Sequence, residues 1–219
     1  MRVAGADVWK GRWVVVVLDN GQFHSAFVAD SIEEAVVELA DSVVVGVDMP
    51  IGLPDGGERR PADLEARTFV GQRRNSVFFT PSAELLECET AVAANVLAKS
   101  EGWPGIAAQA FALKKQILAV QPLAGADERI REVHPEVSFA EALGHPLEWP
   151  KSTWNGVALR RRILEDQGIV LPTDLGPGGK ADVADVLDAA IVAWTAFRIA
   201  EGRGQSFPEG SERIGAIWR

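Results

Sequence analysis

The sequence predicts an α/β fold in which a mixed β-sheet is flanked by helices. Two apolar runs without alternation, at residues 3–6 and 43–47, are typical of strands that are buried on both faces. Three strand-like runs come first along the chain, and a short helix and the second buried run follow. A helix in that position most simply places the buried strand parallel to the first one.

The first 48 residues contain clear signals for these elements. We expect three meandering strands at residues 3–7, 13–18 and 22–29. Asn20-Gly21, between the second and third strands, is the signal of a two-residue hairpin turn. Ser31 and Glu34 form a capping box, which predicts a helix that begins at residue 32 and runs to residue 39.

The rest of the chain is predicted to be largely helical. We expect a helical insertion at residues 54–128 within a single domain of residues 1–219, followed by a strand at residues 129–134 that Pro135 ends. Helices are predicted at residues 137–143, 157–167 and 181–200, with a flexible glycine-rich joint at residues 176–179. Arg160-Arg161-Arg162 is predicted to form a solvated face of the second helix, balanced by nearby acidic residues.

The composition restricts the class of protein. Hydrophobic residues make up 47% and charged residues 24% of the chain, as in globular proteins, and no run approaches the roughly 20 apolar residues of a membrane span. Cys88 is the only cysteine, so we expect no disulfide within the chain and a cytoplasmic location. The net charge of -9 argues against a protein that coats nucleic acid nonspecifically.

Acidic residues gather at one edge of the predicted sheet. Asp7 and Asp48 each follow a buried strand, and parallel strands bring their carboxyl ends to the same edge. The last helix begins with Asp182, Asp185 and Asp188, of which the latter two are neighbours on a helix. Carboxylates in such a group are typical ligands of Mg²⁺ or Mn²⁺, and we expect Asp7, Asp48 and Asp185 to bind the metal.

Each of these aspartates also has a simpler interpretation. Asp7 and Asp48 could merely end a strand or cap a turn. Asp185 and Asp188 point away from the predicted apolar stripe of their helix, on a face that continues through apolar residues. A helix packed on two sides could aim them at the sheet end, whereas a solvated first turn also favours acidic residues through the helix dipole.

Other candidate residues lie near this edge. Glu132 comes late in a strand and is a candidate for a further ligand or for orienting water. His134 is a candidate proton carrier at neutral pH, although a histidine beside proline is more often structural. Arg73, Arg74 and Lys115 are candidates for binding substrate phosphate, and ordinary surface charge is the alternative.

Several segments, in order along nearly the whole chain, carry a family resemblance. They are Gly5-Ala6-Asp7 with Lys10-Gly11-Arg12-Trp13, Val47-Asp48-Met49-Pro50-Ile51-Gly52-Leu53-Pro54, Arg73-Arg74-Asn75-Ser76-Val77-Phe78, Lys115-Gln116, Arg131-Glu132-Val133-His134-Pro135-Glu136 with Ser138-Phe139, and Asp185-Val186-Leu187-Asp188-Ala189. With these segments the chain resembles the domain-of-unknown-function 429 family, whose members are described as predicted nucleases with an RNase H-like fold. The resemblance implies three meandering strands, a helix, a parallel strand and a final helix.

The function expected from the residues and the resemblance is a nuclease or other phosphodiesterase that depends on a divalent metal. Two ions about 3.5–4 Å apart could activate water and stabilise the leaving oxygen in such a site. The candidate catalytic residues are Asp7, Asp48, Glu132, Asp185 and Asp188. One alternative is phosphoryl transfer or hydrolysis on a small nucleotide-like substrate, and another is a noncatalytic binding module that retains the fold.

Overall fold

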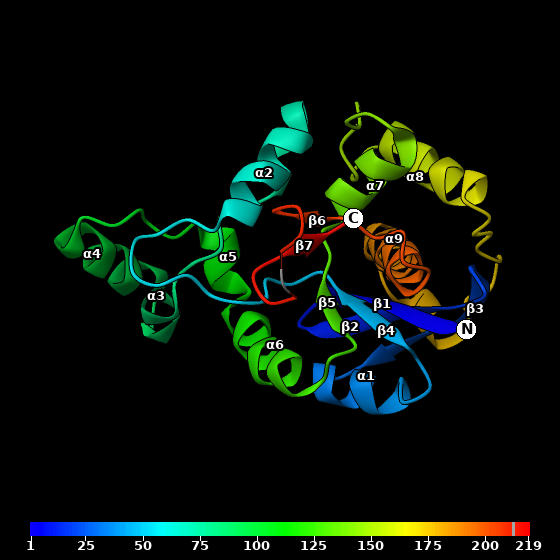
Figure 1. Cartoon of the computed structure of the whole chain (residues 1–219), viewed down its shortest axis with the longest axis horizontal. Helices are drawn as coiled ribbons and strands as arrows, with labels where there is room; N and C mark the ends of the chain where they lie inside the picture. The colour runs from blue at the N-terminus through cyan, green and yellow to red at the C-terminus, as the bar shows by residue number, and fades with distance from the viewer. Residues whose placement is uncertain (212) are drawn as a thin grey trace.

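The computed structural model describes residues 1–211 and 213–219 and contains a five-stranded mixed sheet with helices around it (Figure 1). The sheet has the order β3-β2-β1-β4-β5. Its strands are β1 (Arg2–Trp9), β2 (Arg12–Asp19), β3 (Gln22–Ala29), β4 (Val44–Val47) and β5 (Ile130–Glu132). The first three strands form an antiparallel meander, β4 is parallel to β1, and β5 is parallel to β4. The predicted RNase H-like arrangement is therefore confirmed.

The two turns of the meander have the same backbone conformation. Asn20 and Gly21 have φ values of 50° and 78°, so both occupy the left-handed region that the predicted tight hairpin requires. Lys10 and Gly11, with φ values of 50° and 80°, repeat this conformation between β1 and β2. Such turns match the twist of the flanking strands, which keeps the meander compact.

Helices fill the connections around the sheet. The helix α1 (Ile32–Glu38) connects β3 to β4, and Ser31 caps it by accepting a hydrogen bond from Glu34 N. Between β4 and β5 lie α2 (Pro61–Phe69), η1 (Gly71–Ser76), α3 (Ala83–Glu87), α4 (Ala91–Glu101), α5 (Ala108–Ala112) and α6 (Lys114–Ala126). After β5 come α7 (Pro135–Leu143), α8 (Trp154–Asp166), η2 (Gly176–Lys180), α9 (Val183–Ala200) and the short strands β6 (Ser206–Phe207) and β7 (Ile217–Trp218). None of the helices in the described ranges has the length and apolar character needed to cross a membrane.

Two expectations about local structure are wrong. Pro135 begins α7 instead of merely ending a strand, because proline lacks an N–H group that the first helical turn would leave unsatisfied. Residues 176–179 are not a flexible joint but part of η2, which packs against β3. A Cβ atom on Gly178 would lie 2.5 Å from Ala26 Cβ, so glycine permits this close contact.

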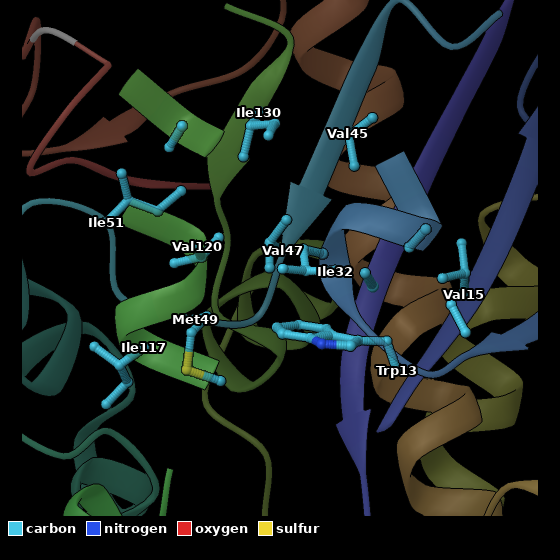
Figure 2. Packing of buried hydrophobic residues seen from close by; sticks show 14 of the residues in the cluster. Trp13, Val15, Ile32, Val45, Val47, Met49, Ile51, Ile117, Val120 and Ile130 are labelled. Atoms are coloured by element: carbon cyan, nitrogen blue, oxygen red, sulfur yellow. The ribbon is translucent and has the colours of Figure 1, made fainter. Parts of the chain in front are cut away.

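The sheet has a hydrophobic core on each face. On one face, Trp13 and Val15 pack with Ile32 of α1 and Ile117 of α6 (Figure 2). The core on the other face includes Val14, Val16, Phe139, Leu187 and Ile191 from β2, α7 and α9. The alternation of neighbouring β2 residues between the two cores is the pattern of a strand covered on both sides.

Two paired glycines determine how α9 crosses the sheet. Gly5 of β1 lies opposite Gly46 of β4 in the register. A Cβ atom on Gly5 would lie 2.2 Å from Ala189 O, and one on Gly46 would lie 2.7 Å from Val192 Cγ1. Because neither glycine has a side chain, the helix backbone lies directly on these strands. This contact brings the first turns of α9 to the carboxyl ends of β1 and β4.

Candidate active site

A cavity of about 560 Å³ lies at the carboxyl ends of β1 and β4. Seven of the predicted site residues line it: Asp7, Asp48, Arg73, Glu132, His134, Asp185 and Asp188. Arg74 and Lys115, which were predicted to bind substrate, are exposed and do not belong to its lining. The tertiary structure thus collects residues from β1, β4, β5, η1 and α9 at one site.

Four carboxyl groups interact at the acidic end of this cavity. Burial, followed by the negative charge of Asp48, raises the pKa of Asp7 well above its usual value. Burial also raises the pKa of Asp48, and a hydrogen bond with the Asp7 side chain opposes the rise. Burial thus disfavours the charged form of both aspartates, and the charge of Asp48 disfavours it further at Asp7.

The two aspartates of α9 complete the cluster. Burial and the charge of Asp188 raise the pKa of Asp185 to about 6, while Lys151 opposes this shift. Asp188 is only 3% exposed, and burial raises its pKa as well. The helix α9 is packed on two sides, which buries Asp188 and brings it to the cavity. Only Val183 departs from the predicted apolar stripe, since it is 51% exposed.

Lys151 is a residue of this cluster that sequence reasoning missed. Its Nζ donates a hydrogen bond to Asp188 Oδ2 at 2.5 Å and lies 4.0 Å from Asp185 Oδ1. Burial alone would lower the pKa of Lys151, but the surrounding carboxylates raise it above its usual value. No spacing rule identifies such a residue, since it lies in the loop before α8, far from the aspartates in sequence.

The donor set of the cluster suits a hard divalent cation. Asp7, Asp48, Asp185 and Asp188 offer carboxylate oxygens, the ligands preferred by Mg²⁺ and Mn²⁺. A cation would also relieve the repulsion that raises their pKa values. Among the described residues, no three His, Cys, Asp or Glu side chains already form a group with metal-site spacing. Ion binding would therefore require adjustment of these side chains.

Glu132 is engaged by a buried arginine. Both of its carboxylate oxygens accept hydrogen bonds from Arg60, at 2.7 and 2.8 Å, and one also accepts from Ile51 N. Arg60 binds Asp63 as well, and Asp63 accepts a hydrogen bond from Thr80 N. These contacts tie the loop after β4 and the start of α2 to β5, and they occupy the oxygens with which Glu132 was expected to bind metal or water.

A second buried ion pair, of Arg160 with Glu136, lies beside the cavity near Asp188. Glu136 accepts hydrogen bonds from Arg73 Nε at 3.0 Å and from Arg160 Nη2 at 2.7 Å. Arg160 has 0% exposure, so the prediction that it belongs to a solvated face is wrong. Tertiary packing overrides the local charge pattern, because α8 turns this one arginine of the three towards α7. Arg162 does pair with Asp166 on the exposed side, as its charge pattern predicts.

His134 connects η1 to the start of α7. Its Nδ1 accepts a hydrogen bond from Glu136 N at 3.2 Å, and its Nε2 lies 3.3 Å from Ser76 O. An accepting Nδ1 leaves the proton on Nε2, which then donates to the carbonyl oxygen. In this arrangement both ring nitrogens have protein partners, and a positive charge on His134 would lower the pKa of Asp48.

Comparisons with known proteins give a family match and two structural likenesses. Among solved structures, the chain is similar to Thermus thermophilus RuvC, with 15% identity and a TM-score of 0.35 over 93% of this chain and 98% of that one. It is also similar to T. thermophilus RuvC in complex with Holliday junction substrate, with 18% identity and a TM-score of 0.34 over 93% and 97%. No curated protein matches. The family model described as "Protein of unknown function (DUF429)" matches residues 5–213, so the chain belongs to this family.

Proposed function

We propose that this protein is a divalent-metal-dependent nuclease that cleaves phosphodiester bonds. The observation that supports this best is the convergence of Asp7, Asp48, Asp185 and Asp188 on one cavity from two parallel strand ends and a helix. Carboxylates that converge at a water-accessible cavity are suited to bind Mg²⁺ or Mn²⁺. When bound, such an ion activates water and stabilises the leaving oxygen.

The residues of the cluster have separate roles in this proposal. Asp7 and Asp48 would hold the metal, since both carboxyl groups line the cavity where the parallel pairing of β1 and β4 ends. Asp185 is a further ligand, because it accepts no hydrogen bond in the described structure. Asp188 is engaged by Lys151 and maintains the charge balance of the centre.

Three other residues of the cavity lining, Arg73, His134 and Glu132, bind substrate or position the residues that do. The Nε of Arg73 binds Glu136 and its Nη2 donates to Ser76 Oγ at 3.4 Å, which leaves Nη1 to meet a phosphate. His134 holds η1 next to α7 and so positions Arg73. Glu132 acts through Arg60, as a positioning residue for the loop that follows Asp48.

The cavity also favours a second candidate, the hydrolysis of a small nucleotide-like phosphate ester. Its volume of about 560 Å³ lies within the range of roughly 300–1,000 Å³ that is usual for small-molecule sites. The net charge of -9 disfavours a long polyanion more than a small ligand.

The cytoplasmic location stays a prediction from the single cysteine Cys88.

The test compares the wild type, Asp7→Asn and a control, Asp55→Asn, whose side chain is exposed outside the cavity. We expect Mn²⁺ to raise the thermal midpoint of the wild type and the control, but not that of Asp7→Asn. Labelled oligonucleotides and nucleotide monoesters are then incubated with each protein and Mn²⁺. Cleavage of oligonucleotides that is lost in Asp7→Asn supports the nuclease, and cleavage of monoesters alone supports the second candidate. Binding without cleavage of either substrate indicates a noncatalytic module.

A further inference from the structure

Lys151 places its ammonium directly against the aspartates of the acidic cluster. Lys151 Nζ lies 2.5 Å from Asp188 Oδ2 and 4.0 Å from Asp185 Oδ1, so its ammonium contacts one carboxylate and faces another. Short contacts between charged groups are the stronger class of hydrogen bond. The side chain nevertheless remains 46% exposed, so a substrate that enters the cavity can reach its Nζ.

The backbone on both sides of Lys151 is held in place by α8. Arg160, which is fully buried, donates a hydrogen bond from Nη1 to Trp149 O at 3.1 Å. Thr153 donates from Oγ1 to Pro150 O at 2.8 Å, and its N–H group binds the same oxygen at 3.1 Å. The ammonium is therefore presented by a loop that several hydrogen bonds fix, rather than by a freely moving surface side chain.

We propose that the Lys151 ammonium takes the place of a second metal ion, so that the centre would hold a single divalent ion, with Asp7, Asp48 and Asp185 as its ligands. This inference rests on the proposed function. A second divalent ion about 3.5–4 Å from the first would have to displace the ammonium from Asp188 or be repelled by it. The positive charge of Lys151 instead faces the phosphate and stabilises the charge that develops on its oxygens.

The alternative is an ion pair that only neutralises a buried aspartate. Both interpretations expect that Lys151→Met perturbs the protein, so stability and activity do not separate them. They differ in the number of ions bound, because only a lysine that stands for a cation leaves an empty ion position when its charge is removed.

The test is the isothermal titration of the wild type, Lys151→Met, Lys151→Arg and Lys99→Met with Mn²⁺ at neutral pH. Lys99 is an exposed lysine of α4 and serves as the control. We expect one ion per chain in the wild type, in Lys151→Arg and in the control. Lys151→Met should bind two ions, the first with an affinity at least tenfold higher. Circular dichroism confirms that each variant is folded.

The outcomes distinguish this inference from the proposed function. Two ions in the wild type, or a single ion in Lys151→Met, would overturn the role of Lys151 and leave metal dependence in place. No binding to the wild type at millimolar Mn²⁺ would overturn both.

Discussion

Replacement of Asp185 by asparagine should stabilise the metal-free protein at neutral pH. The pKa of this carboxyl rises from 3.8 to about 6, mainly because burial disfavours its charge. A shift of roughly 2 units corresponds to about 3 kcal/mol. The helix dipole at the N-terminus of α9 favours the charged carboxylate by about 0.3–1 kcal/mol, which reduces the gain expected from the substitution. The variant should therefore gain about 2 kcal/mol, which raises the midpoint of a chain of this size by about 4–8 °C.

The sign of this effect depends on pH. Between about pH 4 and pH 6 the folded protein binds more protons at Asp185 than the unfolded chain, so this group lowers stability as pH rises. The gain in Asp185→Asn should therefore be complete at pH 8 and nearly absent at pH 3.5. At pH 3.5 the Asp185 carboxyl is largely protonated in both the folded and the unfolded wild type.

The assay is urea unfolding of the metal-free protein at pH 3.5 and at pH 8, followed by circular dichroism. Asp182→Asn is the matched control, since Asp182 is the N-cap residue of the same helix and its side chain is 61% exposed. We expect it to change the free energy of unfolding by less than about 0.5 kcal/mol. Loss of stability in Asp185→Asn at pH 8, or an equal effect at both pH values, would refute the conclusion that burial disfavours the charge of Asp185.

Two further predictions concern the packing that supports the site. Gly5→Ala should destabilise the protein by about 1–3 kcal/mol or more and weaken Mn²⁺ binding, because its Cβ would lie 2.2 Å from the backbone of α9. Gly125→Ala, which meets no atom within 4 Å in α6, should be neutral or stabilising by up to about 1 kcal/mol in the same urea unfolding assay. Arg160→Met should cost about 3–5 kcal/mol, because Glu136 loses a buried partner, and Arg162→Met on the exposed side should cost below about 0.5 kcal/mol. Equal midpoints for the two arginine variants would contradict this difference.

Much of the sheet follows from signals that are local in the sequence. The Asn20-Gly21 turn, the Ser31 cap and the unbroken apolar runs before Asp7 and Asp48 each specify a short element, and the structure shows these elements. Sequence order then places β4 parallel to β1, because a helix connects the meander to the next buried strand. The adjacency of Asp7 and Asp48 at one edge is a consequence of that order.

Local patterns did not reveal which charged groups are buried. The apolar stripe of α9 indicated that Asp188 faces away from the core, and the run of three arginines indicated that Arg160 is solvated. Both are buried, because α9 packs on two sides and α8 turns Arg160 towards Glu136. A helical wheel by itself leaves open whether a second face of the helix is packed.

The sequence by itself determined the order of the strands, the turns between them and the aspartates Asp7 and Asp48 at the edge of the sheet. The prediction that β1 ends at Asp7 is wrong, because β1 continues to Trp9, and Asp7 lies where the parallel pairing of β1 with β4 ends. Only the tertiary structure decided the composition of the centre. The close contact of α9 with Gly5 and Gly46 brings the helix aspartates to the strand ends, and the loop before α8 adds the ammonium of Lys151. The physical reason is the sequence separation of the interacting residues. Turns and strand ends depend on neighbours along the chain, whereas charge pairing across a cavity depends on side chains that only folding brings together.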